Sequence, residues 1–150
     1  MSDLIVEADG GSRGNPGIAG AGALVRNQQG SVLAAVAIPL GRASNNVAEY
    51  TGLVEGLKLV RSLDAEARVE VRMDSKLVVE QMSGRWKIKH ADMRRLAAEA
   101  AGVLPGAQIT YTWIPRGQNG DADALSNEAM DACAAGTEWD ASASAIQPVR

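Results

Sequence analysis

The sequence predicts an α/β fold in which a five-stranded mixed sheet is flanked by helices. The order of apolar periodicities along the chain is three strands, one helix, one strand, two helices, one strand and one helix. The first three strands follow one another through short turns and should form an antiparallel meander. The last two strands each follow a helical crossover, so they should run parallel to the first. A chain of 150 residues is long enough to form one domain with its own core.

The N-terminal part of the chain contains the predicted meander. Its three strands are expected at Leu4–Asp9, Ile18–Arg26 and Ser31–Leu40. The first strand is apolar on both faces, which is typical of a strand covered on both sides, and it ends on the carboxylate of Asp9. The glycine-rich stretch Gly10–Gly17 should be a loop. Gly20 and Gly22 in the second strand mark places where another element packs closely.

The rest of the chain alternates helices and strands. The expected elements are a helix capped by Ser44 or Asn45 and running to about Leu63, a strand at Arg68–Asp74, helices at Ser75–Met82 and Asp92–Val103, a strand at Gln108–Ile114 and a helix at Asp121–Ala135. Residues 136–150 are small and polar and have no period. We therefore expect a folded domain at residues 1–135, followed by a flexible tail or the start of an interdomain linker at residues 136–150.

Composition excludes several classes of protein. Cys133 is the only cysteine, so no internal disulfide can form, as is usual in a reducing compartment. No apolar run is long enough to span a bilayer, and the N-terminus lacks the pattern of a signal peptide. We therefore expect a cytoplasmic protein with no membrane partner. The net charge is −3, but residues 118–150 hold six acids and one base. The preceding part of the chain is thus slightly basic, which permits a nucleic-acid partner.

Four acidic residues from four separate elements should converge at one edge of the sheet. Asp9 and Asp74 end strands that are predicted to be parallel, and ligands of such sheets gather at the carboxyl ends of the strands. Glu49 lies near the start of the first long helix, and Asp123 lies in the first turn of the last helix. Asp123 taken alone fits a helix-cap or surface acid better than a metal ligand, and only the set of four acids favours a shared site. An oxygen-only ligand set indicates Mg²⁺ or Mn²⁺ rather than zinc.

Four motifs, each containing one of these acids, resemble those of the type 1 ribonuclease H family. They are DGGSRGNPG at Asp9–Gly17, SNNVAEY at Ser44–Tyr50, MDSKLV at Met73–Val78 and PRGQNGDADALSN at Pro115–Asn127. The resemblance covers about residues 3–135. It implies a ribonuclease H-like fold and an endonuclease that hydrolyses the RNA strand of RNA–DNA hybrids. Two divalent cations would be held by Asp9, Glu49, Asp74 and Asp123, in a two-metal-ion mechanism that leaves 5′-phosphate and 3′-hydroxyl ends.

The resemblance also implies a set of substrate contacts. The backbone from Gly10 and Gly11 onward, together with Ser12, Asn15 and Glu49, would read the 2′-hydroxyl groups that distinguish RNA from DNA. Asn45 and Asn46 would contact the minor groove, and Lys76 would lie beside the RNA strand. Arg42 and Ser44 would grip a phosphate of the DNA strand. Trp86 would stack on the DNA strand, and a core position for Trp86 is the alternative.

The chain departs from the family pattern in three places. Only the short basic connector Gly84–His90 stands where many members carry an extra helix and a basic protrusion. Arg116 stands where many members carry a mobile histidine; it can act electrostatically on the leaving group or on metal release, but it cannot shuttle a proton near neutral pH. His90 stands where an asparagine often completes the phosphate pocket, and it either serves there or caps the helix at Asp92.

Two other functions stay open on the sequence alone. One fold hosts many chemistries, so a DNA nuclease or strand-transfer module is the first alternative. A non-catalytic module that binds hybrids is the second, although the intact acids speak against it. We expect the chain to be a monomer. Related proteins join this domain to another one, so we also expect that a longer parent chain could carry a fused C-terminal domain.

Overall fold

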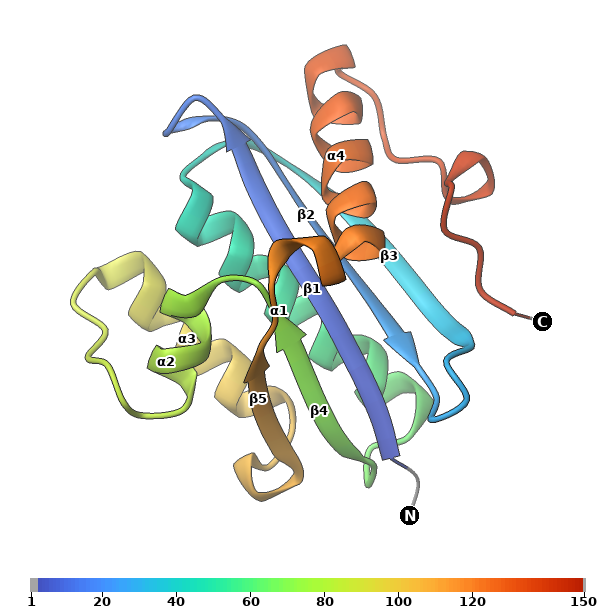
Figure 1. Ribbon diagram of the computed structural model, residues 1–150. Helices are drawn as coiled ribbons and strands as arrows, with labels where there is room; N and C mark the ends of the chain where they lie inside the picture. Colours follow the sequence, from blue (N-terminus) through green and yellow to red (C-terminus); the bar gives the residue numbers. More distant parts are fainter. Residues whose placement is uncertain (1–2, 150) are drawn as a thin grey trace.

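A five-stranded sheet forms the centre of the molecule, in a computed structural model that describes residues 3–149 (Figure 1). The strands are β1 (Asp3–Arg13), β2 (Gly17–Arg26), β3 (Val32–Ala43), β4 (Arg68–Met73) and β5 (Ile109–Trp113), and the helices are α1 (Asn45–Leu63), α2 (Lys76–Met82), α3 (Ala91–Val103) and α4 (Gly120–Ala135). The strand order is β3-β2-β1-β4-β5. β1, β2 and β3 are antiparallel, whereas β4 and β5 run parallel to β1. The predicted fold class is confirmed.

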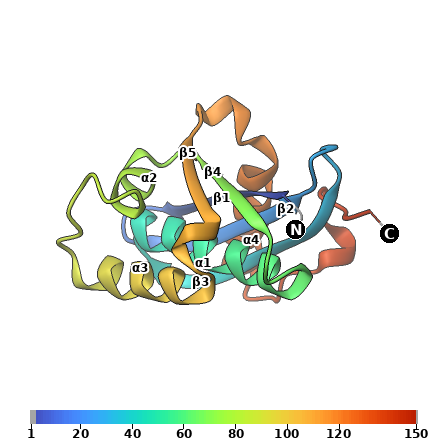
Figure 2. The ribbon, with the colours of Figure 1, turned by 90° about the horizontal axis from the view of Figure 1, so that it is seen from below.

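Helices cover the two faces of the sheet unequally. α1 and α3 lie on one face, and α4 lies on the other (Figures 1 and 2). The larger core forms under α1, where Leu53, Leu57 and Val60 are fully buried together with Val6 and Val71 of the sheet. α4 rests on β1, β2 and β3 (Figure 1). Within residues 3–149, every helix is too short or too polar to cross a lipid bilayer.

The antiparallel strands are longer than the sequence predicted. β1 continues through the expected glycine loop to Arg13, and β3 continues past Leu40 to Ala43. The prediction of a loop over Gly10–Gly17 was therefore wrong for its first four residues. The reason is pairing: β2 follows β1 as far as the pair Arg13 and Ile18, and the left-handed φ of 90° occurs only later, at Gly14. Gly10 thus serves close packing against α1 rather than a turn.

The segment after α4 folds back against α4 and β3 (Figure 1). The indole Nε1 of Trp139 donates to the carboxylate of Glu128 at 2.9 Å, and the backbone N–H of Ala145 donates to the same carboxylate at 3.0 Å. The Val149 N–H donates to the Val32 carbonyl at 2.8 Å. Trp139 and Ile146 also pack against the small core beneath α4. The domain boundary at residue 135 and the linker role of residues 136–150 stay predictions; Met1, Ser2 and Arg150 lie outside the described residues.

Candidate active site

A cleft of about 350 Å³ opens at the carboxyl ends of β1 and β4. Asp9 lies on β1, Asp74 follows the last residue of β4, Glu49 is in the first turns of α1 and Asp123 is in the first turn of α4. All four predicted acids line this cleft. Its other lining residues are Gly10, Gly11, Ser12, Arg13, Asn45, Arg116, Ser126, Asn127 and Met130. Residues that lie up to 121 positions apart in the sequence are thus brought together by the parallel arrangement of the strands.

The distance between Asp9 and Glu49 is set by two glycines. A Cβ atom at Gly10 would lie 2.2 Å from the backbone carbonyl carbon of Ala48, and one at Gly52 would lie 2.6 Å from the carbonyl oxygen of Asp9. Real side chains do not tolerate such separations. Glycine at both positions therefore lets the backbone of α1 touch the backbone of β1, and Glu49 enters the cleft from this contact.

Asp123 is brought to the cleft in the same way, from the opposite face of the sheet. A Cβ at Gly22 would lie 2.5 Å from that of Leu125, and one at Gly20 would lie 2.6 Å from that of Ala129. The prediction that both glycines mark close packing is confirmed. α4 therefore lies directly on β2, and the hydroxyl of Ser126 donates to Asp9 Oδ2 at 3.2 Å.

The carboxylates in the cleft disfavour one another's ionisation. Burial raises the pKa of Asp9 from 3.8 to about 8, and the neighbouring charge of Asp74 adds to the shift. Burial also raises the pKa of Glu49 from 4.5 to about 6, against the opposing effect of a hydrogen bond from Ser75. A cation among these groups would favour their charged forms. The electrostatics therefore fit a positively charged ligand.

The donor set also fits a hard divalent cation. The four acids offer only oxygen atoms, which Mg²⁺ and Mn²⁺ prefer. Within residues 3–149, no group of three or more acidic, histidine or cysteine side chains is already arranged to hold one ion. The four acids therefore share one cleft without being gathered around a single point.

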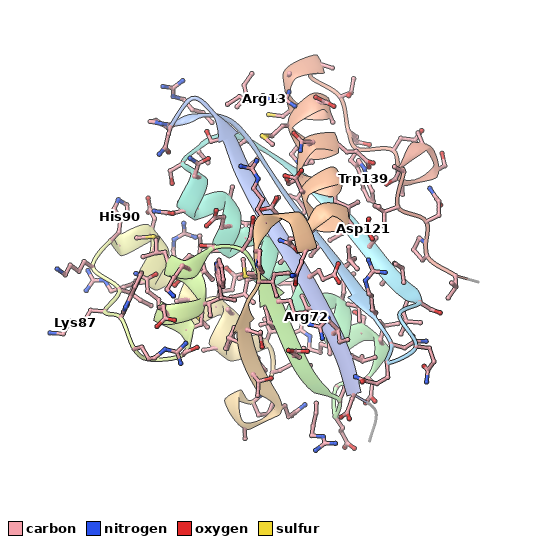
Figure 3. All side chains as sticks on the ribbon, viewed as in Figure 1. Arg13, Arg72, Lys87, His90, Asp121 and Trp139 are labelled. Carbon is pink, nitrogen blue, oxygen red and sulfur yellow. The ribbon has the colours of Figure 1, made fainter. Side chains whose placement is uncertain are left out.

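The cleft also contains two arginines. Arg116, in the short 3₁₀ turn between β5 and α4, is exposed and lines the cleft as predicted. Arg13 was not predicted; it comes from the tip of β1 and pairs with Asp131 of α4 at 2.7 Å (Figure 3). Arg116 thus brings a positive charge to an acidic cleft, which suits a ligand that is itself an anion, whereas the charge of Arg13 is balanced by Asp131.

Two of the predicted 2′-hydroxyl readers, Ser12 and Asn15, form a hydrogen-bonded network with Asn45, a predicted minor-groove contact. The Ser12 N–H donates to Asn45 Oδ1 at 2.8 Å, and the Asn45 N–H donates to Asn15 Oδ1 at 3.2 Å. The Ser12 hydroxyl also donates to the Ala43 carbonyl at 2.7 Å. The tip of the β1–β2 hairpin is thereby fixed to the start of α1. Asn46 lies half-buried in the first turn of α1, beside this network.

The predicted phosphate pocket is less complete. Arg42 lies exposed near the end of β3. The Ser44 hydroxyl accepts the Val47 N–H and caps α1, and His90 Nδ1 accepts the Asp92 N–H and caps α3. Of the two roles considered for His90, the structure shows the helix cap. A shared phosphate site of Arg42, Ser44 and His90 stays a prediction.

The basic connector lies between α2 and α3. Trp86 is 45% exposed, which contradicts the alternative that this residue anchors the core. Arg85 is paired with Glu80 through two hydrogen bonds, and Lys87 points outward (Figure 3). At the other end of α2, the Lys76 ammonium lies 5.7 Å from the centre of the Trp113 ring. The connector therefore offers an exposed ring and cations, as a nucleic-acid contact requires.

Sequence reasoning missed several residues that shape the cleft. Asn119 is fully buried and donates through Nδ2 to the Ala8 carbonyl and to Asp74 Oδ1. Ser126 contacts Asp9, and its position three residues after Asp123 on a helix is a signal that could have found it. Arg26 was also missed: it pairs with Glu7 at 2.9 Å and with Asp121, whose position at the start of α4 Figure 3 shows.

Comparisons with known proteins agree on the family. The sequence profile of a family described as reverse transcriptase-like matches residues 7–129. Solved structures similar to this chain include the N-terminal RNase H domain of Rv2228c from Mycobacterium tuberculosis. Its sequence identity is 51% and its TM-score 0.85, and the match covers 91% of this chain and 99% of that one. RNase H1 from Halobacterium salinarum has 38% identity and a TM-score of 0.81, with 86% of this chain and 98% of that one covered. The chain belongs to the type 1 ribonuclease H family.

The chain spans only part of the length of several curated relatives that it matches. It is 52% identical over 140 residues to the bifunctional protein Rv2228c. This alignment covers 92% of the present chain but only 38% of Rv2228c. It is 40% identical to the ribonuclease HI of Halobacterium salinarum, of which it spans 62%. A third solved structure, LC11-RNase H1 in complex with an RNA/DNA hybrid, has 37% identity and a TM-score of 0.81, and covers 85% of this chain and 96% of that one.

Proposed function

We propose that this chain is a divalent-metal-dependent endoribonuclease that hydrolyses the RNA strand of RNA–DNA hybrids to 5′-phosphate and 3′-hydroxyl products. The observation that carries the proposal is the convergence of Asp9, Glu49, Asp74 and Asp123 in one cleft. Membership of the ribonuclease H family supports it, as does the similarity to a ribonuclease H1 described in complex with an RNA/DNA hybrid.

The four acids would hold two Mg²⁺ or Mn²⁺ ions. When bound, such ions activate a water molecule and neutralise charge that develops on the phosphate and on the leaving oxygen. The residues themselves must be ionised to hold them, and the raised pKa of Asp9 means that metal binding and loss of its proton occur together. Metal binding should therefore strengthen as pH rises toward 8.

The protein's own groups would position the RNA strand. The network of Ser12, Asn15 and Asn45 holds the hairpin tip rigidly beside the acids, where backbone and side-chain groups can contact 2′-hydroxyls. Arg116 brings a positive charge to the lining of the cleft and can stabilise the phosphate. Glu49, at the base of the cleft, can accept a hydrogen bond from a 2′-hydroxyl.

The DNA strand would lie across the other predicted contacts. Arg42 and Ser44 are near the end of β3 and the start of α1, and Trp86 is exposed in the basic connector. Because phosphate contacts position the duplex without reading sequence, we expect cleavage with little sequence preference. His90 caps α3 through Nδ1, so its role toward phosphate is limited to its other ring nitrogen.

The test compares labelled RNA–DNA hybrid, RNA duplex, DNA duplex and branched DNA in Mg²⁺ or Mn²⁺, with end-group analysis of the products. The proposal expects cleavage of the hybrid alone and 5′-phosphate ends. Asp74→Asn should reduce cleavage at least 100-fold, whereas Glu99→Gln, on the outer part of α3, should leave it unchanged. Cleavage of DNA would favour a DNA nuclease, and tight hybrid binding without turnover in any metal would favour a binding module.

A fused C-terminal domain is also proposed for the parent protein. Its support is that Rv2228c, of which this chain matches 38%, bears the name bifunctional protein. Immunodetection of the natural protein at a mass well above 15.6 kDa would support the fusion, and detection at 15.6 kDa would refute it. The expected monomeric state of the 150-residue chain is tested by light scattering.

A further inference from the structure

Strand pairing alone does not fix the two central acids of the cleft. The last pair between β1 and β4 is Glu7 with Arg72, so Asp9 and Asp74 each lie two residues beyond it. Asp9 is still held by β2 through its pairing with Gly22. Asp74 follows the end of β4, and its carbonyl oxygen accepts the indole N–H of Trp113 at 3.2 Å. The carboxylate of Asp74 therefore needs a side-chain partner if its orientation is to be fixed.

Asn119 provides that partner. Its side-chain amide is fully buried, and Nδ2 donates to the Ala8 carbonyl at 3.0 Å and to Asp74 Oδ1 at 3.2 Å. One amide group thus spans the gap between β1 and β4 at the point where their pairing has ended. The orientation of the amide is determined by its neighbours, because a carbonyl and a carboxylate both accept hydrogen bonds and both face the NH₂ group.

The side-chain oxygen of Asn119 does not cap α4, the helix that follows it. An asparagine at an N-cap usually accepts a backbone N–H from the first turn, but Asn119 makes no such side-chain hydrogen bond. Within residues 3–149, Asn119 Oδ1 is the single buried side-chain nitrogen or oxygen atom without a hydrogen-bond partner. This arrangement lowers the free energy of unfolding, because a buried oxygen without a partner and a helix start without a side-chain cap both destabilise the fold.

We propose that Asn119 is a positioning residue, which holds one oxygen of Asp74 against β1 so that the other oxygen faces the cleft. The inference rests on the proposed metal-dependent function, since it assigns Asn119 a task in presenting a metal ligand. The role assigned to Asn119 predicts how its loss should be felt. Loss of the amide should weaken metal binding and turnover much more than it weakens folding or hybrid binding.

The test uses Asn119→Leu, which has nearly the shape of asparagine but neither a hydrogen-bond donor nor an acceptor, and Asn119→Ala in case the leucine variant does not fold. Val60→Ala is the control, because Val60 is fully buried on α1 away from the cleft and its truncation lowers stability without touching the acids. Three quantities are measured for each: the urea midpoint, the Mn²⁺ dissociation constant of the metal-free protein by calorimetry, and kcat and KM on the hybrid.

The proposal expects Asn119→Leu to weaken Mn²⁺ binding about tenfold and to lower kcat at least tenfold, with KM within about threefold of the wild type. A rise in Mn²⁺ concentration should restore part of its turnover. Val60→Ala should keep wild-type Mn²⁺ binding and kcat despite a lower urea midpoint. Wild-type Mn²⁺ binding and kcat in a folded Asn119 variant would overturn the inference while leaving the proposed function intact. A wild-type chain that binds Mn²⁺ but never cleaves the hybrid would refute the function alone, because the calorimetric comparison still decides the role of Asn119.

Discussion

Replacing Asp9 by asparagine should stabilise the metal-free protein at pH 8 even though it destroys a metal ligand. The pKa of Asp9 is raised from 3.8 to about 8 in the folded state, chiefly by burial and by the charge of Asp74. An acid whose pKa is raised by folding keeps its proton in the native state while the unfolded chain releases it. Stability is therefore full below pH 3.8 and declines as pH rises to about 8.

The size of the effect follows from the same shift. At about 1.4 kcal/mol per pKa unit, the ionisation of Asp9 costs at most about 5 kcal/mol at pH 8. Asparagine removes this cost, but it remains a polar side chain in a buried place, and the hydrogen bond from Ser126 to a carboxylate becomes one to an amide. We expect a net gain of about 3 kcal/mol, which is roughly 6–12 °C in Tm for a domain of this size.

The assay is urea unfolding of Asp9→Asn and the wild type in EDTA at pH 4 and pH 8. The variant should be more stable than the wild type at pH 8 but not at pH 4, where native Asp9 keeps its proton and there is almost no ionisation cost to remove. Saturating Mg²⁺ should reduce the difference at pH 8, because the ion stabilises the native wild type more than the variant. Asp131→Asn serves as the control, since that carboxylate is largely exposed and its loss should change stability little at either pH. A variant that is less stable than the wild type at pH 8 would refute the reasoning.

Three further perturbations test other parts of the structure. Gly10→Ala should lower the free energy of unfolding by about 2–3 kcal/mol, because the new Cβ would lie 2.2 Å from the Ala48 backbone. A wild-type urea midpoint in this variant would contradict the close packing of α1 on β1. Trp139→Ala should cost about 2 kcal/mol and leave hybrid cleavage unchanged, since the indole packs under α4 and bonds Glu128; a variant as stable as the wild type would show that the C-terminal segment adds nothing. Gln81→Leu should raise KM for the hybrid at least threefold with kcat retained, because the Gln81 amide donates to the carbonyl of Lys87 and fixes the basic connector; steady-state kinetics with an unchanged KM would remove the connector from the substrate interface.

The fold and the meeting of the four acids followed from the sequence because both depend on short-range signals. Alternation and helical periodicity identify each element, and the crossover rule then makes β1, β4 and β5 parallel. Once the strands are parallel, an acid at the end of each must lie at the same edge. Parallel strands bring Asp9 and Asp74 to the same region of the sheet, and Glu49 and Asp123 lie near helix starts that face it.

Other features could not be predicted because they depend on contacts between backbones. The sequence favours a loop wherever glycines gather, yet Gly10 and Gly11 belong to a strand whose partner continues beside it. A single sequence does not distinguish a glycine that a turn requires from a glycine that lets a helix backbone approach a strand. Likewise, Asn119 lies in the sequence just before a predicted helix, and only the positions of Ala8 and Asp74 show that its amide faces the sheet rather than its own helix.

The cleft depends on two helices that approach the sheet from opposite faces, and they are not held equally well. α1 brings Glu49 and rests on the larger core of long aliphatic side chains. α4 brings Asp123 and rests on a cluster of mostly small residues, in which Leu24 and Leu125 are the largest buried members. Because apolar stabilisation scales with buried area, α4 gains less from its contact with the sheet.

Two further interactions compensate for the small core beneath α4. Arg26 joins Glu7 of the sheet to Asp121 in the first turn of α4, and the segment after the helix adds Trp139 and its bond to Glu128. The ionic link acts next to Asp123, whereas the segment acts on the middle of the helix. Loss of the ionic link should therefore disturb the acids directly, while loss of the segment should lower stability first and reach the cleft only when α4 as a whole loosens.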